Sequence, residues 1–280
     1  MDKAGLITAL TNNGLTQLEQ YSQQISRSSL RISTASTSSL KIGSSRLGGQ
    51  PDLPPGTDWP QWQGRPQSFI AQLQLSDLPH IADTFLPSTG MLWFFYDSQQ
   101  QAFGDKPTDR GAWQVLFAKD TPATLRPAPV PDTLAKQGQF KARALTFSPE
   151  LTLSAQPQLE VPGLSWTDTD QKRYDTVFAQ FQDEAGQAAP RHRISGFPDT
   201  IQDDMRLQCQ MMTHGVTDSA SPQVAELQRH ANDWQLLLQV DTDEQIGMRW
   251  GSSGMLYYWL PVDALRKQQF DQTWLVVQSE

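Results

Sequence analysis

Residues 90–95 read Gly-Met-Leu-Trp-Phe-Phe, and residues 254–259 read Gly-Met-Leu-Tyr-Tyr-Trp. Each block is short, aromatic and bounded by turn residues, which is typical of a β-strand. Three further pairs of segments match in the same order: Gly49-Gln50-Pro51-Asp52 with Gly196-Phe197-Pro198-Asp199, Ile70-Ala71-Gln72-Leu73 with Leu237-Leu238-Gln239-Val240, and Trp113-Gln114-Val115 with Trp274-Leu275-Val276. Four ordered matches predict a duplicated unit of one turn and three strands, with helical material inserted into the second copy before its first strand.

This pattern predicts an α+β fold in one domain spanning residues 1–280, since neither copy alone could bury both faces of its sheet. We place the first repeat at 41–120 and the second at 191–280. Antiparallel and mixed sheets are expected around an aromatic core, because only 38% of the residues are hydrophobic but 9 are Trp and 12 are Phe.

Helices and a linker are predicted around the repeats. Apolar residues at helical spacing indicate a helical segment at 1–26, weakened at Gly14, and a helix at 168–187. The Ser/Thr-rich stretch 26–45 is interpreted as a linker with one or two edge strands, and Ser221-Pro222 as the start of another helix. The predicted strands are 69–75, 91–96, 113–118, 140–147, 234–241, 255–260 and 273–278.

Composition argues against several classes of protein. A net charge of −8 without a Lys/Arg cluster disfavours a nucleic-acid partner. The single cysteine, Cys209, excludes an intramolecular disulfide. Neither a signal peptide nor an apolar run of membrane-spanning length is evident, so we expect a cytoplasmic protein that does not contact membranes. The oligomeric state is left open.

No familiar catalytic pattern emerges, and we expect no cofactor and no metal. The chain lacks a Gly-x-Ser-x-Gly elbow, its four histidines lack metal-ligand spacing, and Cys209 beside two methionines is interpreted as a core residue. Asp241-Thr242-Asp243 begins like a calcium loop but lacks the later ligands, so a solvated hairpin turn is expected. A glycosidase-type pair of carboxylates stays open, because sequence does not fix their separation.

The repeated glutamines are the polar residues that packing explains least well. Gln72 and Gln239 lie within apolar strands, where an unpaired amide would cost on the order of 1–3 kcal/mol. One interpretation gives them backbone partners in the Gly-x-Pro-Asp turns; the other places them in a groove between the repeats that binds a ligand or a partner segment. The residues assigned to this groove are Asp52, Trp59, Gln72, Asp199, Gln202, Gln239 and Trp250.

The same blocks resemble the bacterial YwqG-like family. The likeness rests on Leu47–Pro54 with Trp59-Pro60, on Gly90–Asp97, and on Ile194–Asp199 with Trp250-Gly251, although Ser252 stands where relatives carry an acidic residue. The resemblance implies an α+β fold with duplicated halves and, since members are associated with secreted-toxin loci, an immunity or partner-binding role. The leading hypothesis is therefore a non-enzymatic intracellular protein-interaction module, an immunity-type partner of a bacterial toxin; the alternative is a small-ligand or carbohydrate-binding domain.

Overall fold

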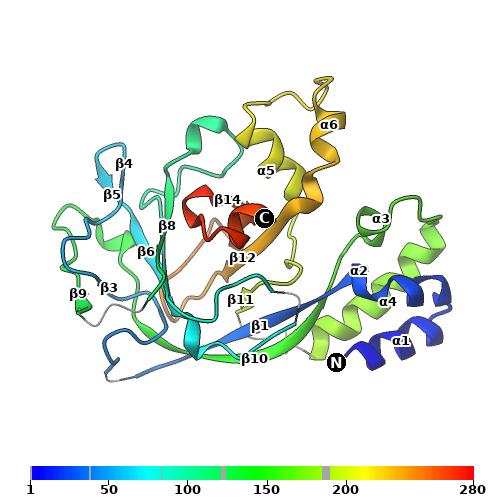
Figure 1. Cartoon of the computed structure of the whole chain (residues 1–280), viewed down its shortest axis with the longest axis horizontal. Helices are drawn as coiled ribbons and strands as arrows, with labels where there is room; N and C mark the ends of the chain where they lie inside the picture. The colour runs from blue at the N-terminus through cyan, green and yellow to red at the C-terminus, as the bar shows by residue number, and fades with distance from the viewer. Residues whose placement is uncertain (1, 38, 83, 121–123, 185–189) are drawn as a thin grey trace.

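The computed structural model describes residues 2–37, 39–82, 84–120, 124–184 and 190–280. These ranges form an α+β fold on one ten-stranded antiparallel sheet, in the order β14-β13-β12-β11-β1-β10-β2-β6-β7-β8, which curls toward a barrel (Figure 1). Its strands are β1 (Ser26–Ala35), β2 (Arg46–Leu47), β6 (Ser68–Gln74), β7 (Met91–Tyr96), β8 (Trp113–Ala118), β10 (Arg143–Leu153), β11 (Arg193–Ile194), β12 (Trp234–Asp241), β13 (Gly254–Pro261) and β14 (Trp274–Ser279).

The centre of the sheet is the long pair of β1 and β10, drawn along the lower edge of Figure 1. Their register is unbroken from Ser26 opposite Leu153 to Ala35 opposite Ala144. The prediction of a linker with edge strands at 26–45 was therefore wrong over β1, which lies between β10 and β11. Ser and Thr dilute its apolar pattern, and backbone pairing on both sides, which sequence does not reveal, makes the segment a strand.

The two flanks of this central pair are built alike. One flank runs through the two-residue strand β11 to β12, β13 and β14, and the other runs through the two-residue strand β2 to β6, β7 and β8. Both first long strands carry a register shift at matching positions, between Leu236 and Leu238 in β12 and between Phe69 and Ala71 in β6. A β-bulge bends and twists its strand locally, and here it falls at the same place in both flanks.

The flanks approach each other at the open ends of the sheet. The Val277 N–H donates to the Phe103 carbonyl at 3.1 Å, which ties the loop after β7 to the edge strand β14. The Trp113 indole donates to the Thr273 carbonyl at 2.8 Å. These bonds nearly close the sheet into a barrel.

Aromatic rings fill the space between the flanks, which confirms the expected aromatic core. Matched residues of the two halves touch: the ring centroids of Phe94 and Tyr258 lie 5.2 Å apart, and those of Trp113 and Trp274 lie 4.8 Å apart, all in edge-to-face geometry. Such pairs add to the stabilisation from buried apolar area.

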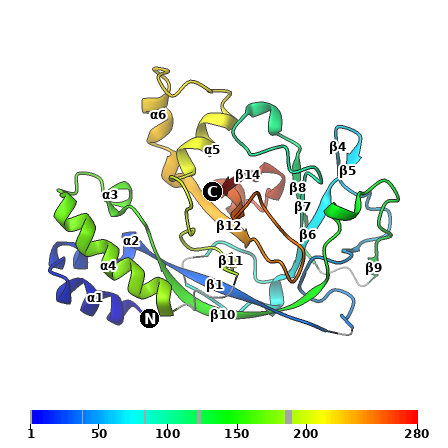
Figure 2. The same cartoon turned by 180° about the vertical axis from the view of Figure 1, so that it is seen from behind.

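The N-terminal segment and α4 pack beside one end of the long β1–β10 pair (Figures 1 and 2). The helical prediction for 1–26 is confirmed as a broken segment, because α1 ends at Asn12 and Gly14 takes a φ of +69°. The predicted helix at 168–187 is α4, and its expected end lies outside the described residues. The α-helices are α1 (Lys3–Asn12), α2 (Ser22–Ile25), α3 (Pro157–Glu160), α4 (Asp168–Glu184), α5 (Arg206–Thr213), α6 (Val224–Gln228) and α7 (Val262–Arg266).

Shorter elements complete the fold. Helices α5 and α6 lie between the turn ending at Asp199 and β12, where the sequence predicted an insertion; α6 begins at Val224, two residues after Pro222, and α5 was not predicted. The 3-10 helices are η1 (Thr16–Tyr21), η2 (Leu75–Asp77), η3 (Pro107–Asp109), η4 (Lys136–Gly138), η5 (Ala231–Asp233) and η6 (Phe270–Gln272). Two small sheets pair β3 (Asp52–Leu53) with β9 (Arg126–Pro127) and β4 (Gln61–Trp62) with β5 (Arg65–Pro66).

Most strand predictions are confirmed, since β6, β7, β8, β12, β13 and β14 match their expected ranges to within one residue. The strand expected at 140–147 begins later and runs much further, as β10 (Arg143–Leu153). Pro149 does not end it and lies opposite Leu30. Within the described ranges, no helix is both long and apolar enough to cross a membrane.

Candidate functional site

Two clusters of an arginine, an aspartate and a glutamine occupy matching places in the two flanks. In each, a two-residue strand brings its arginine opposite a glutamine of the next strand: Arg46 faces Gln72, and Arg193 faces Gln239. The turn that follows each arginine folds back, so that its aspartate reaches the same glutamine.

The first cluster joins the turn to the strand through a buried amide. The Asp52 N–H donates to Gln72 Oε1 at 2.8 Å, and Gln72 Nε2 donates to the Ser44 carbonyl at 2.9 Å and to Asp52 Oδ2 at 3.0 Å. Arg46 Nη2 donates to the same carboxylate oxygen, and its Nη1 donates to the Gln50 carbonyl at 3.1 Å. The glutamine has 0% of its surface exposed.

The second cluster repeats these bonds one by one. The Asp199 N–H donates to Gln239 Oε1 at 2.9 Å, and Gln239 Nε2 donates to the Arg191 carbonyl at 2.6 Å and to Asp199 Oδ2 at 2.9 Å. Arg193 Nη2 lies 2.6 Å from Asp199 Oδ2, and its Nη1 donates to the Phe197 carbonyl at 2.8 Å. The interpretation that each glutamine is satisfied by its Gly-x-Pro-Asp turn is confirmed.

Left-handed backbone makes both turns tight. Gly49 and Gly196 have φ values of +77° and +82°, and each follows another residue with positive φ, Gly48 or Ser195. A Cβ at Gly49 would lie 2.6 Å from the Cβ of Ala142, so close approach as well as φ requires glycine there.

Burial and neighbouring positive charges have opposite effects on the pKa of Asp199. Burial would raise the pKa of Asp199, but the positive charges of Arg193 and Arg191, together with hydrogen bonds from Gln239 and Gln182, lower it below its usual range. The carboxylate is therefore ionised in the folded protein. Its Oδ1 accepts from Gln182 of α4 at 2.8 Å, whereas Oδ1 of Asp52 has no hydrogen-bond partner among the described residues.

The structure does not bring all seven predicted site residues together. The four residues Asp52, Gln72, Asp199 and Gln239 divide between the two clusters and bond to one another. Trp250 is 1% exposed and packs edge-on against the rings of Tyr96 and Phe140 in the core.

The other two predicted site residues lie nearer the surface. Gln202 is exposed, and its Nε2 donates to the Ser279 carbonyl at 3.0 Å. Trp59 is half-buried, its indole N–H donates to the Gln67 carbonyl at 2.9 Å, and it lines a cavity of about 200 Å³ together with Gln50 and Gln139.

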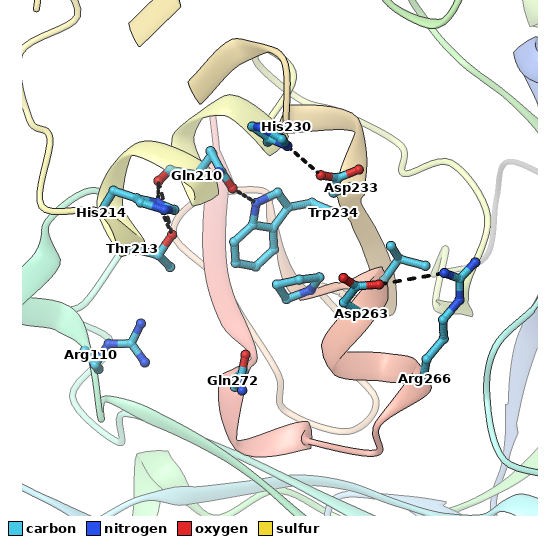
Figure 3. A pocket seen from close by; sticks show the side chains of 12 residues that line it. Arg110, Gln210, Thr213, His214, His230, Asp233, Trp234, Asp263, Arg266 and Gln272 are labelled. Carbon is cyan, nitrogen blue, oxygen red and sulfur yellow. Dashed lines mark hydrogen bonds and ion pairs between the residues drawn. The ribbon is translucent and has the colours of Figure 1, made fainter. Parts of the chain in front are cut away.

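A larger cleft of about 600 Å³ opens elsewhere, on the side of the fold that carries α5 and α7 (Figure 3). Its walls come from the loop before β8, from α5, from η5 and the start of β12, and from the β13–α7–η6 segment. Trp234 lies at its base, and the indole donates to Gln210 Oε1 at 2.7 Å. Sequence reasoning missed this cleft; the signal that could have found it was the segment between Asp199 and β12, which is longer than the matching segment between Asp52 and β6.

Titratable groups around the cleft are mostly paired. His230 Nδ1 lies 3.1 Å from an oxygen of Asp233, and Arg266 Nη1 lies 3.7 Å from an oxygen of Asp263. His214 is held by the Gln210 carbonyl, 2.8 Å from its Nδ1. The cleft therefore offers imidazole, guanidinium, carboxylate and amide groups around one aromatic base, a lining suited to binding a polar ligand.

Residues 45–279 match the profile of a protein family described as a domain of unknown function, DUF1963. The chain belongs to the DUF1963 family. The DUF1963 match includes both clusters and the cleft, but it leaves out the N-terminal helices and β1, which nonetheless lies at the centre of the sheet. No curated protein matches the chain.

Two residues of the DUF1963 region that could act as a nucleophile or a metal ligand, Cys209 and Asp243, are buried in the fold. Cys209 is buried as expected, and burial raises the pKa of its thiol well above the ordinary value. The hairpin turn expected at Asp241–Asp243 joins β12 to β13, and Glu244 and Gln245 in it are exposed, but Asp243 itself is buried and not solvated: its Oδ1 accepts from the Gln245 N–H at 2.8 Å. No three His, Cys, Asp or Glu residues in the described ranges are grouped so that they could hold a metal ion.

Proposed function

We propose that this chain is a non-enzymatic protein-interaction module whose cleft of about 600 Å³ receives a segment of a protein partner. The cleft carries the proposal, since it is large enough for several side chains and combines an aromatic base with polar walls. The cleft carries exposed groups of both charges, in the pairs His230–Asp233 and Arg266–Asp263. Such groups can orient a partner that presents complementary charges across the interface.

We further propose that the two flanks arose by duplication of one turn-and-strand unit. The matching Arg–Asp–Gln clusters, the matching bulges and the contact of Phe94 with Tyr258 support this origin. In a duplicated scaffold, function is expected where the copies differ. The walls of the cleft fit that expectation, because α5 and η5, which contribute to them, belong to the insertion in the second copy.

Photo-cross-linking from the cleft tests the partner proposal directly. A photoreactive phenylalanine analogue replaces the exposed Gln272 at the rim, and the chain is produced in its native host. We expect a covalent adduct with one protein, identified by mass spectrometry. The same analogue at the exposed Gln24 in α2, which does not line the cleft, is the control and should not trap that protein.

Binding to the trapped protein is then measured with purified components. Gln272→Trp fills the mouth of the cleft and should weaken binding at least tenfold, whereas the matched Gln24→Trp should leave it unchanged. Equal affinities of both variants would reject the cleft as the binding site. A small-molecule adduct in place of a protein would favour the alternative function.

That alternative, binding of a small ligand or carbohydrate, is favoured by the cavity beside Trp59. Aromatic surface next to the amides of Gln50 and Gln139 resembles the surfaces that bind sugars, and the cavity volume of about 200 Å³ would accept one ring. A thermal-shift screen against monosaccharides and disaccharides tests this alternative. Stabilisation by one sugar that disappears in Trp59→Ala would support it.

The resemblance to the YwqG-like family extends the leading proposal to an immunity role. In that case the trapped partner should be a toxin of the same host, and co-expression of the chain should restore growth to cells that produce this toxin. Gln272→Trp should abolish the protection, while Gln24→Trp should preserve it. If both variants restored growth equally, the immunity role would not depend on the cleft.

A further inference from the structure

One end of the cleft differs from the rest in its charge balance. Asp233 and Asp263 each have a basic partner within the cleft, His230 and Arg266 respectively. Arg110 has no such partner: in the part of the chain that the structure describes, its recorded contact is with the ring of Trp274, 5.4 Å from the guanidinium carbon to the ring centroid.

The Arg110 guanidinium keeps its hydrogen-bond donors available. The cation–π contact engages the charge of the guanidinium, and no described residue accepts a hydrogen bond from its N–H groups. Figure 3 shows Arg110 and His214 on the same side of the cleft.

The backbone that carries Arg110 is firmly anchored. Buried Asp109 accepts from the Gly104 N–H at 3.0 Å, and the Gly104 carbonyl accepts from both Trp274 Nε1 and Gln208 Nε2 at 3.0 Å. These bonds tie the loop to β14 and to α5, so that the backbone from which the Arg110 side chain extends is fixed before any ligand arrives. Such preorganisation lowers the entropic cost of binding.

We propose that the Arg110 end of the cleft binds an anionic oxygen group, a carboxylate or a phosphate, carried by the partner segment. The inference rests on the proposed function and names the chemistry of the group that the partner presents. Arginine suits such a group because its planar fork donates two parallel hydrogen bonds to two oxygens. Trp234 at the base of the cleft would contact the apolar part of the same segment.

Two simple anions serve as probes, and the two arginines of the cleft serve as a matched pair. Succinate and inorganic phosphate are titrated separately at constant ionic strength, and the indole N–H signal of Trp274 is followed by NMR. We expect a saturable shift that weakens about tenfold or more in Arg110→Gln and persists in Arg266→Gln. Both variants lose one exposed positive charge, so general electrostatic attraction would affect them equally.

The outcomes separate the sources of the anion. Saturation by phosphate alone would support a phosphorylated segment, and saturation by succinate would support an acidic side chain or a chain terminus. Arg110→Lys should bind with intermediate strength, since it keeps the charge and loses the planar fork. A shift that never saturates, or equal weakening in Arg110→Gln and Arg266→Gln, would overturn the inference.

Failure of this inference can be distinguished from failure of the proposed function. A partner that binds Arg110→Gln as tightly as the unaltered chain, but loses binding to Gln272→Trp, would refute the anionic group and retain the cleft. Anion binding at Arg110 without any protein partner would retain the site and refute the partner. Arg110 is exposed, so the variant should fold normally, and its melting temperature verifies this.

Discussion

Replacing the buried glutamines by leucine tests how the two clusters stabilise the fold. In Gln72→Leu the Asp52 N–H loses its acceptor and has no other partner in the described structure. A buried donor left unsatisfied costs about 1–3 kcal/mol, and loss of the two bonds from Nε2 adds about 1 kcal/mol each. Burial of the leucine side chain returns about 1 kcal/mol. The net destabilisation expected is about 2–4 kcal/mol.

The second cluster gives an independent value for the same quantity. Gln239→Leu leaves the Asp199 N–H without its acceptor in the same geometry, so the two losses should agree within about 1 kcal/mol. The two glutamines share no hydrogen-bond partner, so the double variant should lose the sum of the two values.

The assay is urea unfolding followed by tryptophan fluorescence and by far-UV circular dichroism, with thermal melting as a second measurement. Each kcal/mol should lower the melting temperature by about 2–4 °C in a domain of this size. Gln114→Leu is the control, because Gln114 lies in the half-buried part of β8 and its amide makes no hydrogen bond to a described residue. A loss below about 1 kcal/mol in either buried variant, or an equal loss in the control, would refute the reasoning.

Three further predictions concern titration, backbone and packing. The pKa of Asp199 is lower in the folded protein than in the unfolded chain, where it is about 4. The ionised carboxylate therefore stabilises the fold fully above about pH 4, and this stabilisation is lost as the pH falls through the lowered folded-state pKa. Measurement of the unfolding free energy as a function of pH should detect the loss. Gly104→Ala should destabilise by about 2–4 kcal/mol, since φ is +74° and a Cβ would overlap the Leu275 carbonyl oxygen; retention of the native melting temperature would contradict this. Trp93→Phe should cost about 1 kcal/mol more than Trp250→Phe, because the Trp93 indole N–H donates to the buried Asp52 carbonyl, whereas the Trp250 indole N–H has no acceptor among the described residues; urea unfolding of the two variants measures this difference.

The elements of the fold differ in how far they could be predicted from the sequence. Aromatic strands such as β7 and β13 are evident locally, because each is short, apolar and bounded by turn residues. The partners of the glutamines were predicted from the same repeat, since an amide in an apolar strand requires a donor and an acceptor nearby. Polar β1 gave no such signal, and its central place depends on pairing with β10, more than a hundred residues away.

The sequence by itself determined the paired turns, the long apolar strands and the aromatic composition of the core, because these follow from short-range pattern and from residue type. Tertiary structure alone decided that Arg46 and Arg193 complete the two clusters and that an insertion forms the cleft at Arg110 and Trp234. Strand pairing and cavity formation join segments far apart in the chain, and their energies depend on distances that no local pattern encodes.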